Sequence, residues 1–411
     1  MRCKRVRTPA EARALGPGPA EVEDTVRRVL AHVRRAGDAA VREYTRRWDG
    51  AEPPGTAGEA GGRIDVAAAR ELPAELRDAL ELAIANVRTV AEAGLAAGAE
   101  VTLPQGQSVR LRDEPVASAG LYAPGGRAPY PSSVIMGVVT ARAAGVADVA
   151  LAVPPRPDGT VHPLLLGAAV LSGATRVYPM GGAQAVAALA YGTESIPPVE
   201  VIAGPGNAYV TEAKRQVFGH VGIDGLAGPS DVLVLAGGDA DPAVVALDLL
   251  AQAEHGRGTL VVAVSDSPDL LAAVGEAVRA APDTGAVAVL AEVRDLAEGL
   301  AWAEGFAPEH LELLGEEAES LAGGVRRAGC VFVGTGAAFG DYVAGSNHTL
   351  PTQGAARWAS GLSPRVFRRR WAEVRVGPEA ARALAPAGAV IARAEGFERH
   401  AASMEWRMQR R

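Results

Sequence analysis

The chain has 411 residues, 48% of them hydrophobic and 22% charged, which is the composition of a globular protein rather than a disordered one. Its formal net charge of -7 argues against general affinity for nucleic acid, and no apolar run reaches the roughly 18 residues of a membrane span. Cys3 and Cys330 are the only cysteines, which excludes a disulfide framework and a thiolate zinc site. We therefore expect a cytoplasmic protein that binds neither nucleic acid nor membrane, with two domains and additional segments, because the chain is too long for one ordinary core.

Residues 1–20 are expected to form an N-terminal arm, and residues 21–115 a helical segment. Apolar residues at helical spacing predict two helices within 21–49, separated at Gly37 and Asp38, and a long helix at about 73–97. Between them, residues 51–62 are rich in Gly, Pro and Ala and are predicted to be a loop. We expect the helical segment to pack on the second of two α/β domains.

From residue 116 onward, short apolar runs alternate with helical ones, which predicts βα units and parallel sheets. One series of runs extends from Val116 to Val217 and a second from Val232 to Val333. We therefore predict an α/β fold with two Rossmann-like, incompletely doubly wound parallel-sheet domains, at 116–229 and at 230–355. An extended helical C-terminal tail at 356–411 is expected to mediate dimerisation.

Three strand ends of the first series break into glycine-rich turns that lead into helices, at 120–126, 180–184 and 203–209. In a parallel sheet these turns open at the carboxyl edge, where glycine lets the backbone approach a phosphate and a helix N-terminus supplies N–H donors. None is a G-x-G-x-x-G fingerprint, so a tight turn without a ligand is the better interpretation of any single one. Together, and with Tyr122, Gln184 and Asn207 beside them, they favour a nucleotide site.

Gln252 and His255 stand three residues apart at the end of a predicted helix that stops at Gly256. Residues at this spacing project from one side of a helix, so an amide oxygen and an imidazole there can hold a metal or a polar ligand. Spacing alone favours the simpler interpretation, a solvated helix end that carries a histidine.

Pro308 is predicted to open a helix that carries Glu309 and His310, because proline suits the first turn of a helix. A carboxylate beside an imidazole is equipped to remove protons from two different groups. The alternative is a carboxylate placed to interact with the helix dipole. The polar, glycine-rich segment 340–352 is predicted to be a loop, in which Asp341 is an oxygen ligand for a divalent cation and His348 either a ligand or a brace.

Seven blocks of this sequence, spread over nearly the whole chain, resemble histidinol dehydrogenases. They occur in the order of that family and include several long matches. The blocks are AGLYAPGG at 119–126, GGAQAVAALAYGTE at 181–194, GPGN at 204–207, AGPS at 227–230, QAEHG at 252–256, APEHL at 307–311 and GDYVAGSNHTLPT at 340–352.

The resemblance implies a metal-dependent enzyme that oxidises L-histidinol to L-histidine through histidinaldehyde with two NAD, the last steps of histidine biosynthesis. It implies one Zn²⁺ per subunit, with Mn²⁺ as an alternative, and a homodimer whose active site is shared between subunits. It also implies that the domain at 116–229 binds NAD and that the domain at 230–355 binds the metal and the substrate. It also implies that Glu309 and His310 are the two proton acceptors.

The other site residues implied by the resemblance form three groups. The NAD contacts are Tyr122, Gln184 and Asn207. The metal ligands are Gln252, His255, Asp341 and, from the second subunit, His400. The substrate contacts are Ser230, Gln252, His255, His310, Asp341, Glu395 and His400. His348 belongs to a matching block but is not one of the implied ligands, which favours its bracing role.

The chain also departs from the family's usual pattern. Asp231 stands where Glu is usual, Gly237 and Gly238 replace a commoner Ala-Asp, and a Phe-His pair expected within 87–94 is absent. A related branch of the family oxidises a sulfonated propanediol, which is an alternative substrate. The alternative from another class is a metal-dependent binding protein with the same fold, but a binding protein has no use for Glu309 beside His310.

Overall fold

The structure is a computed structural model that describes residues 1–18, 21–51, 71–96, 98–125 and 128–408. It divides into two compact units, of which the first comprises Met1–Gly94 and Val116–Phe367 and the second Leu95–Pro115 and Arg368–Arg411. Most of the loop predicted at 51–62, and the end of the first glycine-rich turn at 126, lie outside the described residues. Within the described part of the chain, no helix is both long and apolar enough to cross a membrane.

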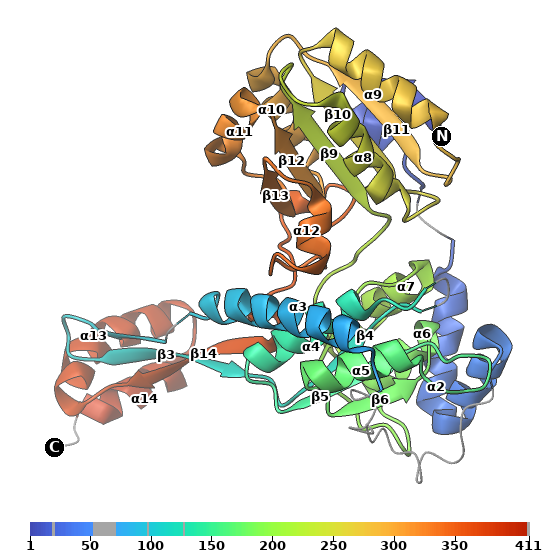
Figure 1. Ribbon diagram of the computed structural model, residues 1–411. Helices are drawn as coiled ribbons and strands as arrows, with labels where there is room; N and C mark the ends of the chain where they lie inside the picture. The colour runs from blue at the N-terminus through green and yellow to red at the C-terminus, as the bar shows by residue number, and fades with distance from the viewer. Residues whose placement is uncertain (19–20, 52–70, 97, 126–127, 409–411) are drawn as a thin grey trace. The chain divides into compact units, whose positions relative to one another are not determined.

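The first unit contains a five-stranded parallel sheet with helices on both faces (Figure 1). Its strands, in spatial order, are β6 (Arg176–Pro179), β5 (Asp148–Val153), β4 (Ser118–Tyr122), β7 (Val201–Ala203) and β8 (Gly222–Ile223). One face is covered by α3 (Ala74–Ala93), α4 (Pro131–Ala143) and α5 (Pro163–Ser172). The other face is covered by α2 (Glu23–Tyr44), α6 (Gly182–Tyr191) and α7 (Ala208–Val217).

A second parallel sheet in the same unit has six strands. In spatial order they are β1 (Arg2–Arg5), β11 (Val287–Glu292), β10 (Leu260–Ser265), β9 (Asp231–Ala236), β12 (His310–Leu314) and β13 (Cys330–Val333). Helices α8 (Pro242–Ala253) and α9 (Pro268–Ala280) cover one face. Helices α1 (Pro9–Arg13), α10 (Leu296–Phe306) and α11 (Glu316–Ser320) cover the other, and α12 (Ala337–Tyr342) follows β13.

The predicted α/β fold with two parallel sheets is confirmed. The central strand β9 is buried along its whole length and β4 from its second residue onward, as expected where helices cover both faces of a parallel sheet. The break predicted between two N-terminal helices is also present, since Gly37 interrupts α2 with a φ of 52°. The N-terminal arm belongs to the second sheet, because β1 pairs with β11 in parallel and α1 packs on α10.

The packing of the N-terminal helices differs from our expectation. Helix α2 packs on α6 and α7, and α3 on α4 and α5, so both cover the first sheet rather than the second α/β domain. Asn86 on α3 also donates a hydrogen bond to the carbonyl oxygen of Val343, at 2.8 Å. The apolar stripe of an amphipathic helix identifies its buried face but not the sheet that covers it.

Two predictions of local structure are wrong. Pro308 does not open a helix, since His310–Leu314 is the strand β12, in which His310 and Glu312 alternate with Leu311 and Leu313. This run is buried throughout, and a short buried run does not by itself distinguish a strand from a helix. Asp341 lies in the short helix α12 rather than in a loop.

The second unit combines a three-stranded antiparallel sheet with two helices. The strand order is β14 (Arg368–Arg375), β3 (Ser108–Pro115) and β2 (Ala99–Thr102). Helices α13 (Pro378–Ala394) and α14 (Glu398–Met408) pack on each other through a small core of alanines and Met404. The C-terminal tail is therefore helical from residue 378, as predicted, but it begins with a strand whose partner lies more than 250 residues earlier in the sequence.

Candidate active site

The Glu309–His310 pair lies at the amino ends of two neighbouring strands of the second sheet. Strand β9 leads to β10 and β11 on one side, whereas β12 leads to β13 on the other, so β9 and β12 flank the point where the chain reverses direction across the sheet. His310 pairs with Val232, which places Glu309 beside Asp231. Ser230 directly precedes β9 and is partly buried; its carbonyl oxygen accepts a hydrogen bond from the backbone N–H of Leu260.

Glu309 and His310 are almost completely buried, with exposed fractions of 5% and 3%. Oε2 of Glu309 accepts a hydrogen bond from the backbone N–H of Asp231 at 2.9 Å and lies 3.8 Å from Nδ1 of His310. Nδ1 of His310 is 3.3 Å from the carbonyl oxygen of Asp231, and Nε2 is 3.2 Å from Oδ1 of Asp341. The structure thus brings the two predicted proton acceptors together with Asp341.

Burial and mutual charge shift the pKa values of these three groups. Burial raises the pKa of Glu309 to about 7, although the charge of His310 opposes the shift. Burial alone would lower the pKa of His310, but Glu309 and Asp341 outweigh it and raise the value to about 9. For Asp341, burial is outweighed by the hydrogen bond and charge of His310, so its pKa is lowered. Near neutral pH the imidazole of His310 is therefore protonated and donates a hydrogen bond to Asp341. The carboxyl group of Glu309 is near the midpoint of its titration.

Three of the implied metal ligands come from elements that pack on each other at this edge. Helix α8 ends at Ala253, so Gln252 lies in its last turn and His255 just beyond, while α12 packs on α8 and carries Asp341. Gln252 is buried, and its Nε2 has no hydrogen-bond partner among the described residues. His255 is exposed as a residue, yet the protein around its ring desolvates it enough to lower its pKa, against the charge of Asp341.

These donors suit a divalent cation in chemistry, because a lowered pKa keeps an imidazole neutral and a carboxylate ionised, the forms that bind a metal. An amide nitrogen without a partner can equally be the oxygen of a flipped amide, which is a further donor for a cation. In the part of the chain that the structure describes, however, no three His, Cys, Asp or Glu side chains already converge at metal-binding distance.

The remaining implied residues of this site, Glu395 and His400, lie in the second unit. Glu395 caps the C-terminus of α13 and His400 lies in the first turn of α14; both are exposed. The ring of His400 lies 5.2 Å from that of Phe397. His348 is in the first unit, where its ring is hydrogen-bonded to the backbone of Ser132 and burial lowers its pKa to about 4, a contact that fits a brace.

The implied NAD contacts lie at the carboxyl edge of the first sheet. The chain proceeds from β4 to β5 and β6 on one side and from β7 to β8 on the other, and ligands of such sheets bind at this reversal. Tyr122 ends β4, and Asn207 caps the N-terminus of α7 by accepting hydrogen bonds from two backbone N–H groups at 3.0 and 3.2 Å. Gly204, between them, has a φ of 121°, and a Cβ there would collide with the carbonyl oxygen of Tyr122.

Asp49 is not among the site residues predicted from the sequence. It links Gln184, the third implied NAD contact, to this edge of the sheet. It accepts hydrogen bonds from Nε2 of Gln184, at 3.2 Å, and from the backbone N–H of Gly181. The next N–H, that of Gly182, donates to the hydroxyl of Tyr122 at 3.2 Å. Two donors that we expected to face a phosphate thus have protein acceptors. Oε1 of Gln184 is buried and lacks a partner among the described residues.

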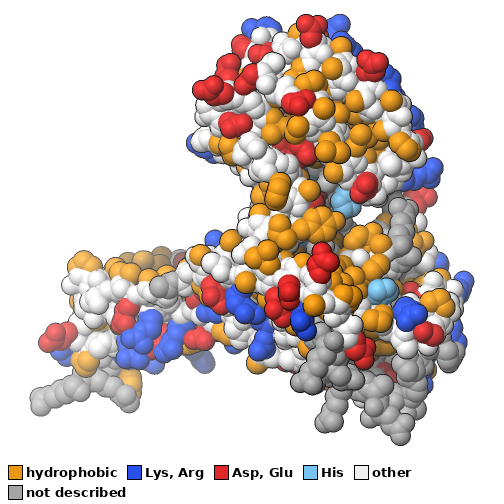
Figure 2. Space-filling model, viewed as in Figure 1, with side chains coloured by type: hydrophobic (Ala, Val, Ile, Leu, Met, Phe, Trp, Pro, Cys, Tyr) orange, Lys and Arg blue, Asp and Glu red, His pale blue; other side chains and the backbone are white. Residues whose placement is uncertain are grey.

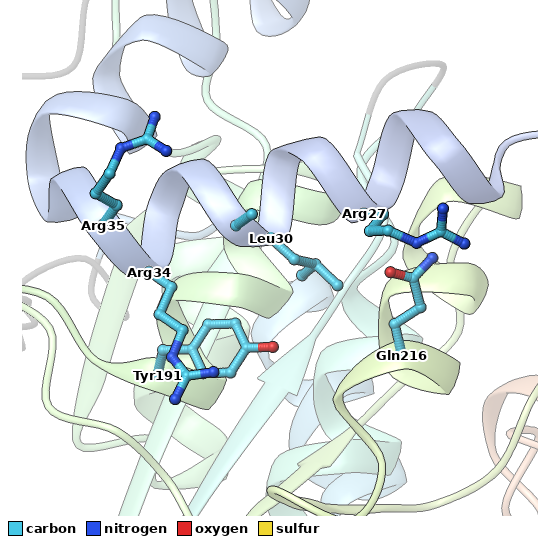
Figure 3. A pocket seen from close by; sticks show the side chains of 7 residues that line it. Arg27, Leu30, Arg34, Arg35, Tyr191 and Gln216 are labelled. Carbon is cyan, nitrogen blue, oxygen red and sulfur yellow. The ribbon is translucent and has the colours of Figure 1, made fainter.

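A separate pocket lies on the surface formed by α2, α6 and α7 (Figure 3). It contains none of the predicted site residues. Two of its arginines have partners of their own, since Arg34 stacks over the ring of Tyr191 and Arg27 pairs with Glu23 and Asp24. We therefore place the candidate active site at the strand ends rather than in this pocket.

Two parallel sheets with helices on both faces, one with a buried carboxylate–imidazole pair and one with glycine-rich turns at its reversal point, define an α/β enzyme of the dehydrogenase kind. Residues 17–408 match the family model described as histidinol dehydrogenase. The histidinol dehydrogenases of Ruegeria pomeroyi and Cereibacter sphaeroides are 45% and 46% identical to this chain, each over 95% of the chain and 93% of the relative. The crystal structure of histidinol dehydrogenase from Elizabethkingia anophelis matches with a TM-score of 0.90 and 30% identity, covering 100% of this chain and 98% of that one. The chain belongs to the histidinol dehydrogenase family and is an oxidoreductase.

Proposed function

We propose that this protein is an L-histidinol dehydrogenase that produces L-histidine through histidinaldehyde, with NAD as the hydride acceptor in both oxidations. The observation that carries the proposal is the buried Glu309–His310 pair, whose pKa values differ and whose Nε2 atom faces Asp341. A pair of titratable groups with separated pKa values is the equipment of acid–base catalysis. The chain's membership of the histidinol dehydrogenase family supports histidinol as the substrate.

The two residues have different tasks in this proposal. His310 takes the hydroxyl proton of the alcohol as the carbinol hydride leaves, which yields the aldehyde. Glu309, with a pKa of about 7, removes a proton from the water that adds to the aldehyde. His310 returns its proton to the aldehyde oxygen as the water adds, which gives the hydrate and restores the neutral imidazole. It then takes a hydroxyl proton from the hydrate as a second hydride leaves, which yields the carboxylic acid, and this acid ionises to the carboxylate. Each oxidation thus releases one proton to the protein and two electrons to NAD.

The proposed metal is one Zn²⁺ per subunit, with Mn²⁺ as the alternative. Gln252, His255 and Asp341 would hold it together with the partner subunit's His400. When bound, the ion would supply a positive charge that attracts the nitrogen atoms of the substrate and would so help to position the carbon that reacts. If Asp341 served as a metal ligand, its charge would be shared with the ion and would stabilise the protonated His310 less, which would lower the pKa of His310 toward the value that a general base needs.

The proposed NAD site is the carboxyl edge of the first sheet. Its support is the position of Tyr122 and Asn207 on either side of the strand reversal, together with the unpartnered amide oxygen of Gln184. The backbone donors at Gly181 and Gly182 already have acceptors. We therefore expect NAD to contact side chains there rather than to occupy a phosphate loop.

The second unit supports the proposed homodimer. Its helices share only a small core, and it carries large apolar side chains at its surface (Figure 2), which on a soluble protein mark an interaction surface. Those more than 40% exposed include Trp371, Val374, Val376, Val390, Ile391 and Phe397. In the proposed dimer this surface docks on the partner and brings Glu395 and His400 to the partner's site, beside Ser230.

Counting NADH produced per substrate consumed tests the function. Two NADH per L-histidinol supports the proposal, one indicates a simple alcohol dehydrogenase, and none favours a binding protein. A sulfonated propanediol assayed in parallel tests the substrate of the related branch. Turnover of that diol without turnover of L-histidinol would reject the proposed substrate while retaining the enzyme class.

Mixing two inactive variants tests the shared site. In a mixed dimer of His400→Ala and His255→Ala with ligation across subunits, one site carries both lesions and the other neither, so up to half of the activity per dimer returns. Each variant mixed with itself is the control. If mass measurements confirm subunit exchange and no activity returns, His400 does not act across the dimer.

A further inference from the structure

Asp231 contacts both members of the Glu309–His310 pair. Its backbone N–H donates to Oε2 of Glu309 at 2.9 Å, and its carbonyl oxygen lies 3.3 Å from Nδ1 of His310. Its side chain adds a third link, because Oδ1 accepts a hydrogen bond from the backbone N–H of Glu309 at 2.8 Å. The position of Asp231 therefore sets the position of both groups at once.

The carboxylate of Asp231 is only 1% exposed, and a buried charge requires a partner of opposite sign. Arg13 supplies it, with 2.5 Å from one terminal nitrogen to Oδ2 and 3.4 Å from the other to Oδ1. The backbone N–H of Gln353 also donates to Oδ2, at 3.3 Å. The pair is held more firmly than a surface salt bridge, because it is desolvated and the guanidinium geometry is fixed.

Arg13 also holds the segment that leads into Glu309 from the other side. Its guanidinium donates to the carbonyl oxygens of Phe306 and Ala307, at 2.8 to 3.1 Å, and stacks over the ring of Phe306 at 3.4 Å. Ala307 ends α10 in the left-handed conformation, with a φ of 52°, which an alanine adopts only when its surroundings hold it there. One side chain of the N-terminal arm thus joins the end of α10, the start of β9 and the segment before β12.

We propose that Arg13 is a positioning residue for the catalytic pair, acting through Asp231 and through the carbonyl groups at the end of α10. Arg13 contacts neither Glu309 nor His310. It neutralises the Asp231 carboxylate, which is hydrogen-bonded to the backbone of Glu309, and it holds the turn at Phe306 and Ala307 that precedes Glu309. The inference rests on the proposed function for its kinetic consequence, but its structural consequence is independent of the substrate.

The test is Arg13→Ala, with Arg5→Ala as the matched control. Arg5 lies in the same arm, and its contact with Glu292 is an exposed surface pair at 3.8 Å. Arg13→Ala should lower kcat for both oxidations by about 10- to 100-fold, since a misplacement of about 1 Å costs a rate of that order. KM for substrate and NAD should change little, and millimolar guanidinium should restore part of kcat. Arg5→Ala should match the wild-type protein in each respect.

A second variant covers a failure of Arg13→Ala to fold, because the double substitution Arg13→Met with Asp231→Asn removes both charges together. The side-chain oxygen of asparagine still accepts the hydrogen bond from the backbone N–H of Glu309, so this protein should fold. Its kcat should remain low, and guanidinium should not restore it. Full kcat in either folded variant would overturn the proposal.

A measurement without substrate separates this inference from the proposed function. Backbone hydrogen exchange of a peptide covering residues 306–312 should be faster in Arg13→Ala than in Arg5→Ala or the wild type. If the wild type does not oxidise histidinol, the proposed function fails and the exchange rates alone decide the inference. Unchanged exchange in that peptide would reject it, whatever the substrate.

Discussion

We expect the protein to lose stability as the pH rises from acidic to mildly alkaline values. Replacing Glu312 with glutamine should remove much of that loss. Glu312 is 1% exposed, lies on β12 and accepts a hydrogen bond from the backbone N–H of Ala337 at 2.6 Å. Its carboxyl group is also hydrogen-bonded to that of Asp248 on α8. Oδ2 of Asp248 and Oε2 of Glu312 have no donor partner among the described residues, so the two carboxyl groups must hold a proton between them.

The pH window follows from the direction of the shift. Burial, with the charge of Asp248 added, raises the pKa of Glu312 from 4.5 to about 8. An acid whose pKa is raised by folding keeps its proton in the folded state while the unfolded chain releases it, so stability is lost as the pH rises through this interval. One retained proton over two pH units corresponds to about 2.7 kcal/mol, which is the upper bound for the difference. Glutamine donates to Asp248 through its amide and has no proton to lose.

Urea unfolding of the wild type and of Glu312→Gln at about pH 5.5, 6.5 and 7.5 measures the effect as a difference in slope. The wild-type free energy of unfolding should fall by up to about 2.7 kcal/mol more than that of the variant. Glu276→Gln, at an exposed position of α9, should follow the wild type. Parallel curves for the wild type and Glu312→Gln would mean that the pair holds no proton in the folded state.

Three further outcomes are expected. Lys214→Met should lower the free energy of unfolding by roughly 3–5 kcal/mol in urea titration, because it leaves the buried carboxylate of Asp224 unpaired; adding Asp224→Asn should recover most of the loss, and no recovery would contradict this account. His310→Ala should slow both oxidations by roughly 10²–10⁴-fold in stopped-flow assays, whereas Glu309→Gln should spare alcohol oxidation more than oxidation of supplied histidinaldehyde; equal losses would reject the division of tasks. Chelation should abolish turnover, with recovery on adding Zn²⁺ or Mn²⁺ and weaker metal binding below about pH 6.5; full activity in protein shown to be free of metal would end the claim of a metal requirement.

The two parallel sheets could be predicted because local features of the chain encode them. Central strands such as Val232–Leu235 are continuous apolar runs, and glycines mark their ends. The break at Gly37 could be predicted for the same reason, since a φ of 52° favours glycine wherever it occurs. In each case the signal lies within a few residues of the element that it predicts.

The features that could not be predicted depend on distant partners. Strand β14 forms against β3, with Arg368 opposite Pro115, and nothing in its own arginine-rich sequence identifies that partner. Asp49 reaches Gln184 across 135 residues, and Arg13 reaches Asp231 across 218. A single charged residue on a short helix is an ordinary surface residue until the fold places a buried carboxylate beside it.

The edge of each sheet that carries its site, by contrast, can be argued from chain order. In a parallel α/β sheet, residues that directly follow a strand or begin the next helix lie at the carboxyl edge. Residues that end a helix or directly precede the next strand lie at the amino edge. Tyr122 and Asn207 belong to the first kind, and this structure places them at the carboxyl edge of the first sheet. Gln252 ends a helix, Ser230 precedes β9 and Glu309 precedes β12, so all three belong to the second kind. A helix start lies at the carboxyl edge, so the helix predicted at Pro308 implies the wrong edge for Glu309. A strand at His310–Leu314 places the pair at the same edge of the sheet as Gln252.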